Sequence, residues 1–222
     1  MRLVEQMAST TRMVKTTKVA WSGMSSPLTG LMMFVNDAGI VNESLREWNT
    51  TTDKDKQARK GGARTFFARL QMAYVYEILE AVKGIQKSKE WMAKVEQCPK
   101  TTQDHFAEVC AFLNTSDYEA LRILRNNAGF HYADKMSVRA VEDIATRTPE
   151  DCSTFSQGDR LLDWYFELGD KVAQHIVVRQ IFKIEEGKDI GKESDAIVNR
   201  IFDIAEKIAL FAGAFIQEQT KA

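Results

Sequence analysis

The stretch "ARTFFARLQMAYVYEILEAV", residues 63–82, decides the fold class, because its apolar residues recur every three or four positions. This period is typical of an amphipathic helix, whereas a half-buried strand alternates every second residue. We predict one helix from about Ala63 to Glu96, with a bend at Gly84 and an end before Pro99. The face predicted to be buried comprises Phe66, Phe67, Leu70, Ala73, Tyr74, Glu77, Ile78 and Ala81.

The same period continues on both sides of this stretch. A first helix begins near Pro27, and the polar run at 49–62 is expected to be a loop that enters the next helix at its glycine pair. Further helical segments are predicted at 105–113, 116–127, 136–148, 157–184 and 193–218, where Ser116 and Glu119 would cap the second of them. The segment at 136–148 also fits a strand, but a short helix is favoured. No segment keeps strand alternation, so we predict an all-α protein, an up-and-down bundle of four to five main helices with short accessory helices.

Two regions are expected along the chain. Residues 1–25 contain Arg2, Arg12, Lys15 and Lys18 against one acid, and they are predicted to form a loosely ordered basic extension, with an organelle-targeting segment as the alternative. Residues 26–222 are predicted to form one helical domain, since 44% hydrophobic residues can fill one sizeable core.

The composition narrows the function classes. Lys plus Arg is 30 against 31 for Asp plus Glu, so affinity for nucleic acid would have to come from a local basic patch. Cys98, Cys110 and Cys152 are widely spaced, which indicates reduced thiols in a cytoplasmic protein and no zinc-type cysteine cluster. The longest apolar runs are far shorter than the roughly 18 residues of a spanning helix, so no membrane association is expected.

The segment "LRNNAGFHYADK", residues 124–135, carries the strongest functional signal. It places Arg125 and His131 on the two sides of a predicted helix end, near Asn126–Asn127, where both side chains can reach one exposed spot. The common alternative is a structural one, in which Arg125 forms a salt bridge at the helix end and His131 packs between Phe130 and Tyr132.

RNA phosphodiester cleavage suits these residue types. An imidazole exchanges a proton at neutral pH, and a guanidinium stays charged while negative charge grows on a phosphate. A ribose 2′-hydroxyl can be the internal nucleophile, so this chemistry requires no metal and no cofactor. We therefore consider Arg125, Asn126 and His131 as candidate catalytic residues.

The motif also resembles a known family. Arg125-Asn126, four residues and His131 match the RNxxxxH form of the Rx4-6H motif of the HEPN superfamily, and "LRNNAGFHY" is similar to the RNxxxFHY run of uncharacterised bacterial HEPN-like proteins. This resemblance implies an all-α bundle, a metal-independent endoribonuclease in a toxin or phage-defence setting, and a homodimer whose two motifs form one cleft. It further implies His131 as general acid or base, Arg125 as phosphate ligand and Asn126 as an orienting group. A cognate antitoxin or other protein partner would fit that setting.

Other residues are expected to assist this motif. A basic rim for RNA would be formed by Arg122, Lys135 and Arg139. Tyr132 is expected to hold the loop against the bundle. Asn36 and Asp37 have two interpretations, a supporting role beside the motif or, as the favoured one, a buried structural hydrogen bond.

The remaining histidines give no metal site, because His105 and His175 have no second ligand at helical spacing. Two functional hypotheses stay open from the sequence. The first is the RNA-cleaving enzyme, and the second is a non-catalytic HEPN-like helical module that binds a nucleotide, RNA or a protein partner. A buried ion pair of Arg125 with an acid would favour the second.

Overall fold

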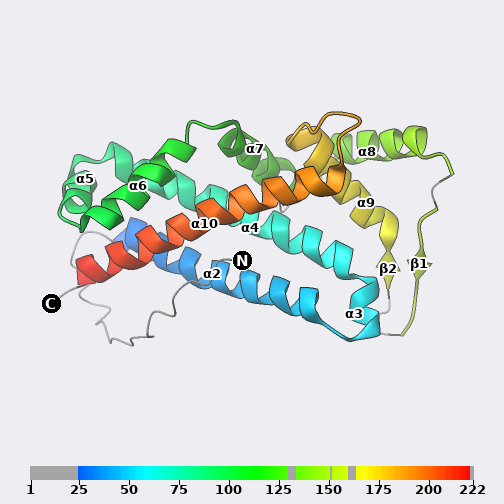
Figure 1. Ribbon diagram of the computed structural model, residues 1–222, viewed down its shortest axis with the longest axis horizontal. Helices are drawn as coiled ribbons and strands as arrows, with labels where there is room; N and C mark the ends of the chain where they lie inside the picture. The colour runs from blue at the N-terminus through cyan, green and yellow to red at the C-terminus, as the bar shows by residue number, and fades with distance from the viewer. Residues whose placement is uncertain (1–24, 130–133, 151, 160–163, 221–222) are drawn as a thin grey trace.

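Three long helices form the centre of the protein (Figure 1). The computed structural model describes residues 25–129, 134–150, 152–159 and 164–220. Within them α2 (Ser25–Thr50) and α4 (Lys60–Lys87) form an antiparallel pair joined by α3 (Lys54–Ala58), and α10 (Ile190–Thr220) packs on α2 and α4. The predicted all-α bundle is confirmed. The predicted basic extension, residues 1–25, lies outside the described residues except for Ser25.

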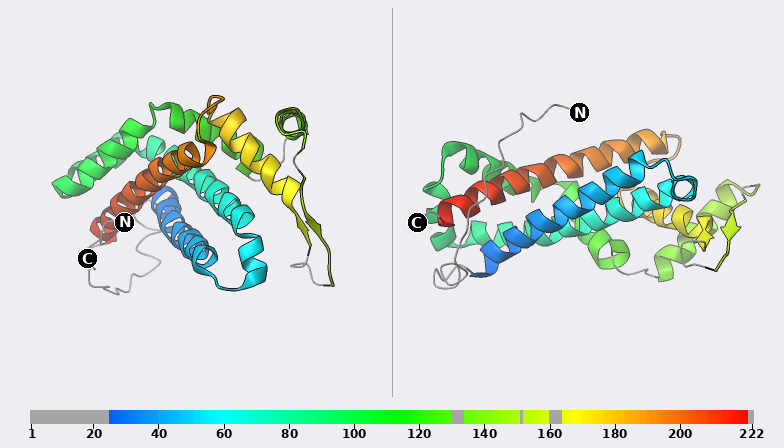
Figure 2. Two further views of the ribbon diagram at one scale, coloured as in Figure 1. Left: turned by 45° about the vertical axis from the view of Figure 1, so that its right-hand side comes forward. Right: turned by 90° about the horizontal axis from the view of Figure 1, so that it is seen from below.

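Shorter elements surround this centre, as the two views of Figure 2 show. Helix α6 packs on α10, while α7 and the π-helical turn η1 pack on α4. Helix α9 runs into a second π-helical turn, η3, and both contact α8. The bounds of the shorter elements are α5 (Lys89–Glu96), α6 (Lys100–Phe112), α7 (Ser116–Leu124), η1 (Arg125–Gly129), α8 (Asp134–Arg147), α9 (Glu167–His175) and η3 (Ile176–Ile181).

The core lies where α10 crosses the other helices. Ile204, Ile208, Phe211 and Phe215 are buried at spacings of three and four residues, so one stripe of α10 faces inward. Phe211 joins this stripe to α6, because its ring centroid is 5.0 Å from that of Phe106. In the described ranges, no helix is both long and apolar enough to cross a membrane.

The helix predicted from Ala63 to Glu96 is wrong as a single element. The chain breaks at Ser88, whose φ of −94° and ψ of 119° are extended, so that α4 ends at Lys87 and α5 begins at Lys89. The Ser88 hydroxyl accepts a hydrogen bond from the backbone N–H of Trp91 at 3.4 Å. Serine favours this capping position over a helix interior, which explains why the chain breaks here and not at Gly84.

Two other expectations are corrected. The expected loop at 49–62 contains α3, and α4 already begins at Lys60, so the glycine pair lies in the first turn of the helix. The expected helix at 157–184 begins only at Glu167, because β1 (Phe155–Ser156) and β2 (Tyr165–Phe166) form a short antiparallel pair before it. The rings of Phe155 and Phe166 lie 4.9 Å apart across this pair, a contact that a continuous helix would remove. The short helix favoured at 136–148 is confirmed as α8.

Gly62 lies against the side chain of Asp170, where α4 contacts α9. A Cβ atom at Gly62 would overlap the carboxylate of Asp170, whereas a Cβ at the adjacent Gly61 would meet no atom within 4 Å. We expect Gly62→Ala to destabilise the fold by about 1–3 kcal/mol, as overpacking does. The control Gly61→Ala is expected to be neutral or to stabilise by up to about 1 kcal/mol through helix propensity. Urea unfolding of both variants checks this, and equal midpoints would contradict the close approach.

Candidate functional site

The candidate motif begins where α7 widens into a π-helical turn. Helix α7 is capped by Thr115, whose hydroxyl accepts from the backbone N–H of Tyr118 at 3.3 Å, so the expected cap at Ser116 is wrong by one residue. The chain then continues through η1, where Asn127 Nδ2 donates to the carbonyl of Ile123 at 2.9 Å. Wide turns of this kind often occur at functional sites, because they reorient side chains at a helix end.

Arg125 projects from the first position of η1 onto α4. Its Nε donates to a carboxylate oxygen of Glu77, and its Nη1 donates to Asn126 Oδ1 at 3.3 Å. The side chains of Arg125 and Glu77 are 42% and 48% exposed. The pair is therefore a surface pair, worth about 1 kcal/mol or less, and a phosphate can compete for the guanidinium. Asn126 is exposed beside it.

His131 lies outside the described residues, as do Phe130 and Tyr132. The convergence of His131 and Arg125 on one cleft, and the supporting role of Tyr132, thus stay predictions. The structure places Arg125 and Asn126 together at the start of η1, where α7 ends.

A polar seam between α4 and α7 holds this turn in place. Glu80 accepts from the hydroxyl of Tyr118 and pairs with Lys83 at 3.2 Å, and Lys83 donates to the same hydroxyl at 3.0 Å. The Tyr118 hydrogen bond lowers the pKa of Glu80, and burial raises the pKa of Tyr118. This polar seam comprises Glu77, Glu80, Lys83, Tyr118 and Arg125.

The sequence analysis missed the polar seam. The acids on α4 recur three positions apart, and Tyr118 and Arg125 lie seven positions apart on the α7–η1 segment. The spacings indicate two helical faces but not their partners. The sequence pattern does not indicate that these two faces contact each other. The contacts join Arg125 to Glu77 and Tyr118 to Glu80, which are 48 and 38 positions apart.

Arg69 of α4 holds η1 by a hydrogen bond to its backbone. It is a buried arginine of α4, and its Nη1 donates to the carbonyl of Ala128 at 3.1 Å. The cavity beside it has a volume of about 30 Å³ and is lined by Asn127, Ala128 and residues of α9 and η3. This space is sufficient for a water molecule but not for a nucleotide. Arg69 therefore supports the backbone of the motif, and a substrate would have to approach from the surface.

The expected basic rim is only partly neutralised. Arg122 is exposed and forms two hydrogen bonds with Glu119, at 2.8 and 2.5 Å. This interaction lowers the pKa of Glu119 and raises that of Arg122. Lys135 and Arg139 are exposed on α8, and no acid among the described residues lies within ion-pair distance of either. Two of the three expected rim cations thus have no acid partner within the part of the chain that the structure describes.

Asn36 and Asp37 lie on α2, the helix that packs on α4 and α10. The favoured interpretation, a buried hydrogen bond, is wrong for Asn36, which is exposed, while Asp37 is half-buried. Both residues lie close to the apolar stripe of α2 in the sequence, which suggested that they would be buried. In the structure they lie at the edge of that stripe. Their supporting role beside the motif stays a prediction.

Other reactive side chains form no metal centre in the described part of the chain. No group of three or more His, Cys, Asp or Glu side chains is placed to hold a metal ion there. His175 instead lies with its Nε2 3.1 Å from Asp143 Oδ2. Cys98 and Cys110 are buried, and burial raises the pKa of the Cys110 thiol to about 11.

The chain was compared with models of protein families, with curated proteins and with solved structures, and none of them matches it.

Proposed function

We propose that the protein is a metal-independent endoribonuclease, acting in the cytoplasm in a toxin or phage-defence setting. The observation that carries the proposal is the half-exposed guanidinium of Arg125, presented with Asn126 at the start of a π-helical turn, six residues before His131. The exposed cations Lys135 and Arg139 support it, since phosphate contacts dominate RNA affinity. The resemblance to HEPN proteins agrees with this assignment.

The reaction follows from the residue types. The imidazole of His131 accepts the proton of a ribose 2′-hydroxyl, whose oxygen attacks the adjacent phosphorus. The bond from phosphorus to the 5′ oxygen breaks, and that oxygen takes a proton from a general acid. The Arg125 guanidinium binds the phosphate and stabilises the charge of the transition state. The products are a 2′,3′-cyclic phosphate and a 5′-hydroxyl.

A homodimer would supply the general acid, as His131 of the partner subunit. Val138 and Val141 support this part of the proposal, because they are exposed apolar side chains on α8, the helix that follows the motif. A second copy that covers them would bring two motifs close to each other.

A second candidate function is a non-catalytic module that binds RNA or a protein partner, such as an antitoxin, through the same surface. The observation that favours it is the ion pair of Arg125 with Glu77, since this acid already occupies the Nε of the proposed phosphate ligand. The pair is half-exposed, however, and not the buried pair that would favour this candidate strongly.

The two candidates separate in an assay of purified protein with single-stranded RNA in excess chelator. We expect cleavage, and we expect Glu77→Gln to lower KM by up to about fivefold, because the neutral amide competes less with a phosphate for Arg125. The control is Glu90→Gln, which removes another exposed, ion-paired acid, the partner of Lys94 on α5, and is expected to leave KM unchanged.

Each outcome of this assay selects one account. RNA binding without cleavage would reject the enzyme and support the binding module. A fall in kcat with unchanged KM in Glu77→Gln would show that Glu77 orients Arg125 instead of competing with the substrate.

A further inference from the structure

A second basic site lies at the junction of α8, α9 and η3, away from the polar seam. Here the structure has a cavity of about 220 Å³. Its polar lining consists of three cations, one imidazole, one hydroxyl and one amide, namely Arg147, Lys171, Arg179, His175, Thr148 and Gln174. No carboxylate is among the lining residues. Three acids just outside the lining, Glu186, Glu167 and Asp143, pair with Arg147, Lys171 and His175, which leaves Arg179 as the lining cation without an acid partner among the described residues. We call this the α8–α9 cavity.

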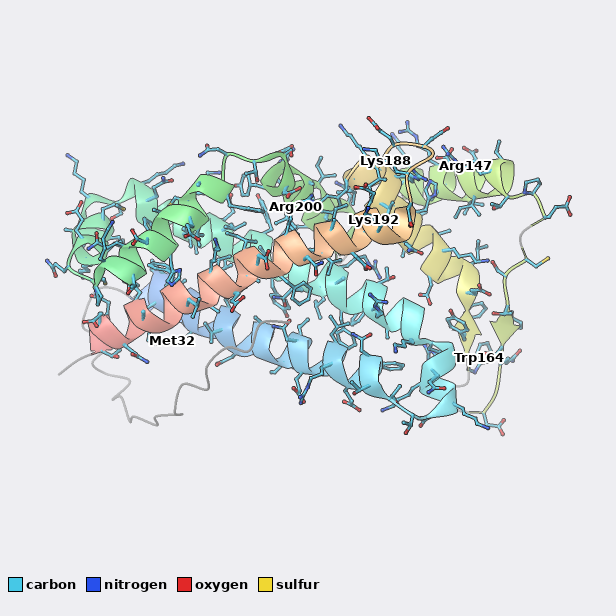
Figure 3. The ribbon with its side chains drawn as sticks, in the orientation of Figure 1. Met32, Arg147, Trp164, Lys188, Lys192 and Arg200 are labelled. Carbon is cyan, nitrogen blue, oxygen red and sulfur yellow. The ribbon has the colours of Figure 1, made fainter. Side chains whose placement is uncertain are left out.

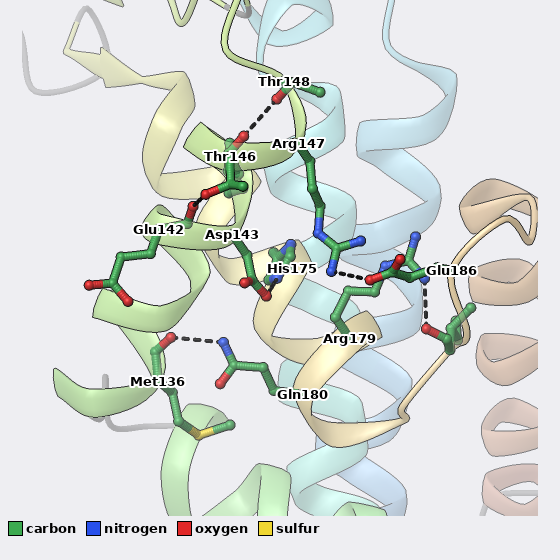
Figure 4. Close-up of polar contacts among 12 residues, drawn as sticks. Met136, Glu142, Asp143, Thr146, Arg147, Thr148, His175, Arg179, Gln180 and Glu186 are labelled. Carbon is green, nitrogen blue, oxygen red and sulfur yellow. Dashed lines mark hydrogen bonds and ion pairs between the residues drawn. The ribbon is translucent and has the colours of Figure 1, made fainter.

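The walls of the α8–α9 cavity are fixed by hydrogen bonds between elements. His175 of α9 pairs with Asp143 of α8, and its side chain is only 10% exposed. One turn further on, Gln180 Nε2 donates to the carbonyl of Met136 at 2.9 Å. Figure 4 shows these contacts joining the two helices, so the cavity is part of the packed structure.

Arg179 is held in the cavity without being neutralised. Its Nη1 donates to the carbonyls of Ile184 and Glu185, both at 2.6 Å. Carbonyl groups fix the guanidinium but do not cancel its charge, and no acid in the described residues is within ion-pair distance of Arg179. A half-buried, uncompensated charge of this kind is costly unless an anion can bind.

The chain turn after η3 creates this arrangement. Lys183 has a φ of 54°, in the left-handed region, and the N–H of Ile184 returns to the carbonyl of Val178 at 3.0 Å. These features are those of a Schellman-type helix end, normally occupied by glycine. The turn aims two successive carbonyls at Arg179 and then presents Glu186.

Glu186 is the ion-pair partner of Arg147, the other arginine of the cavity. Its carboxylate pairs with Arg147 at 2.6 Å, and its side chain is 75% exposed. In Figure 3, Arg147 of α8 and Lys188, which follows Glu186 on its loop, lie near each other at the upper right of the view, and Figure 4 shows Arg147 and Arg179 reaching toward this loop. Arg147 and Arg179 therefore bond to consecutive residues of one loop, 184–186, so both guanidinium groups lie against the same short segment.

We propose that the α8–α9 cavity binds a phosphomonoester, whose phosphate displaces Glu186 and is held by Arg147 and Arg179. A single carboxylate leaves Arg179 uncompensated, whereas a dianion can satisfy both arginines. Guanidinium groups match phosphate oxygens in geometry and charge. The cavity is smaller than the roughly 300–1,000 Å³ of pockets for drug-sized ligands, which fits a phosphate with a sugar or a chain end attached. This proposal does not depend on RNA cleavage at Arg125.

Calorimetric titration of the full chain tests the proposal at constant ionic strength. The ligands are inorganic phosphate, adenosine monophosphate, and one short RNA carrying either a 5′-phosphate or a 5′-hydroxyl. We expect at least one phosphomonoester to bind, and we expect Arg147→Gln to weaken it about tenfold or more, as loss of a charged hydrogen bond does. The ligand that binds most tightly identifies the source of the phosphate group. It is inorganic phosphate, the mononucleotide or the 5′-phosphorylated RNA.

Glu186→Gln keeps the test decisive if an arginine variant fails to fold. It removes an exposed acid from the loop and is expected to tighten binding by up to about fivefold, because the competing ion pair is lost. Glu90→Gln, remote from the cavity, is the control and is expected to leave the affinity unchanged. Absence of binding by inorganic phosphate, adenosine monophosphate and the 5′-phosphorylated RNA, or binding that neither Glu186→Gln nor Arg147→Gln alters, would overturn the proposal.

Discussion

Replacing His131 with alanine is expected to lower the rate of RNA cleavage by about 10²- to 10⁴-fold, the usual contribution of a general acid or base. The physical reason is that histidine is the side-chain type whose ordinary pKa lies close to neutral pH, so the imidazole can accept and return a proton during the reaction. Steady-state cleavage of single-stranded RNA in excess chelator measures the effect. Helicity and thermal stability are expected to stay the same, which circular dichroism would show.

The other histidines provide matched controls for this variant. His105 lies on α6, which packs on α10 and not on η1 in any extensive contact. We expect His105→Ala to retain cleavage. An unchanged rate in His131→Ala, or an equal loss in both variants, would remove His131 from the reaction.

The second large effect concerns the core. Phe211→Ala is expected to reduce the free energy of unfolding by about 3–5 kcal/mol, because the substitution empties a fully buried aromatic site. Phe211 is 0% exposed, and its ring lies 5.0 Å from Phe106 and 5.2 Å from Phe215, so its loss separates α10 from α6. Chemical unfolding followed by circular dichroism measures the change.

The adjacent residue gives the control for the core variant. Leu210 is 45% exposed and lies outside the buried stripe of α10, and Leu210→Ala is expected to change the stability by no more than about 0.5 kcal/mol. Equal destabilisation by the two variants would show that α10 does not pack with the stripe described above.

The long helices could be predicted from the sequence because their apolar period is local. The inward stripe of α10 has the expected spacing of three and four residues. The face predicted for α4 is only partly right, because Ala73 and Ile78 are buried whereas Phe66 and Glu77 are exposed. Their ends were harder to predict, since a single capping serine, Ser88, outweighs the continuing apolar period of 63–96.

The region at 157–184 shows where the sequence pattern fails. Trp164, Tyr165 and Phe166 are adjacent apolar residues, which a helix-based analysis places on one helix. In the structure Tyr165 and Phe166 form a strand, stabilised by residues near Phe155. Such pairing depends on contacts across ten residues, which periodicity does not report.

The candidate site could likewise be predicted only in part from the sequence. The sequence predicts that Arg125 and Asn126 sit at a helix end, and they do. It does not predict the partner of Arg125, because Glu77 is 48 positions away on another helix. Nor does it predict the α8–α9 cavity, because the turn at Lys183 is what brings the Ile184 carbonyl to Arg179.

The central claim is that RNA is cleaved by its own 2′-hydroxyl at the Arg125–His131 motif. The most direct test is end analysis of the fragments made by purified protein from single-stranded RNA in excess chelator. The account predicts fragments with 2′,3′-cyclic phosphate and 5′-hydroxyl ends, produced by the unaltered protein and lost in His131→Ala. Fragments with 3′-hydroxyl and 5′-phosphate ends, or intact RNA after incubation with the unaltered protein, would contradict it.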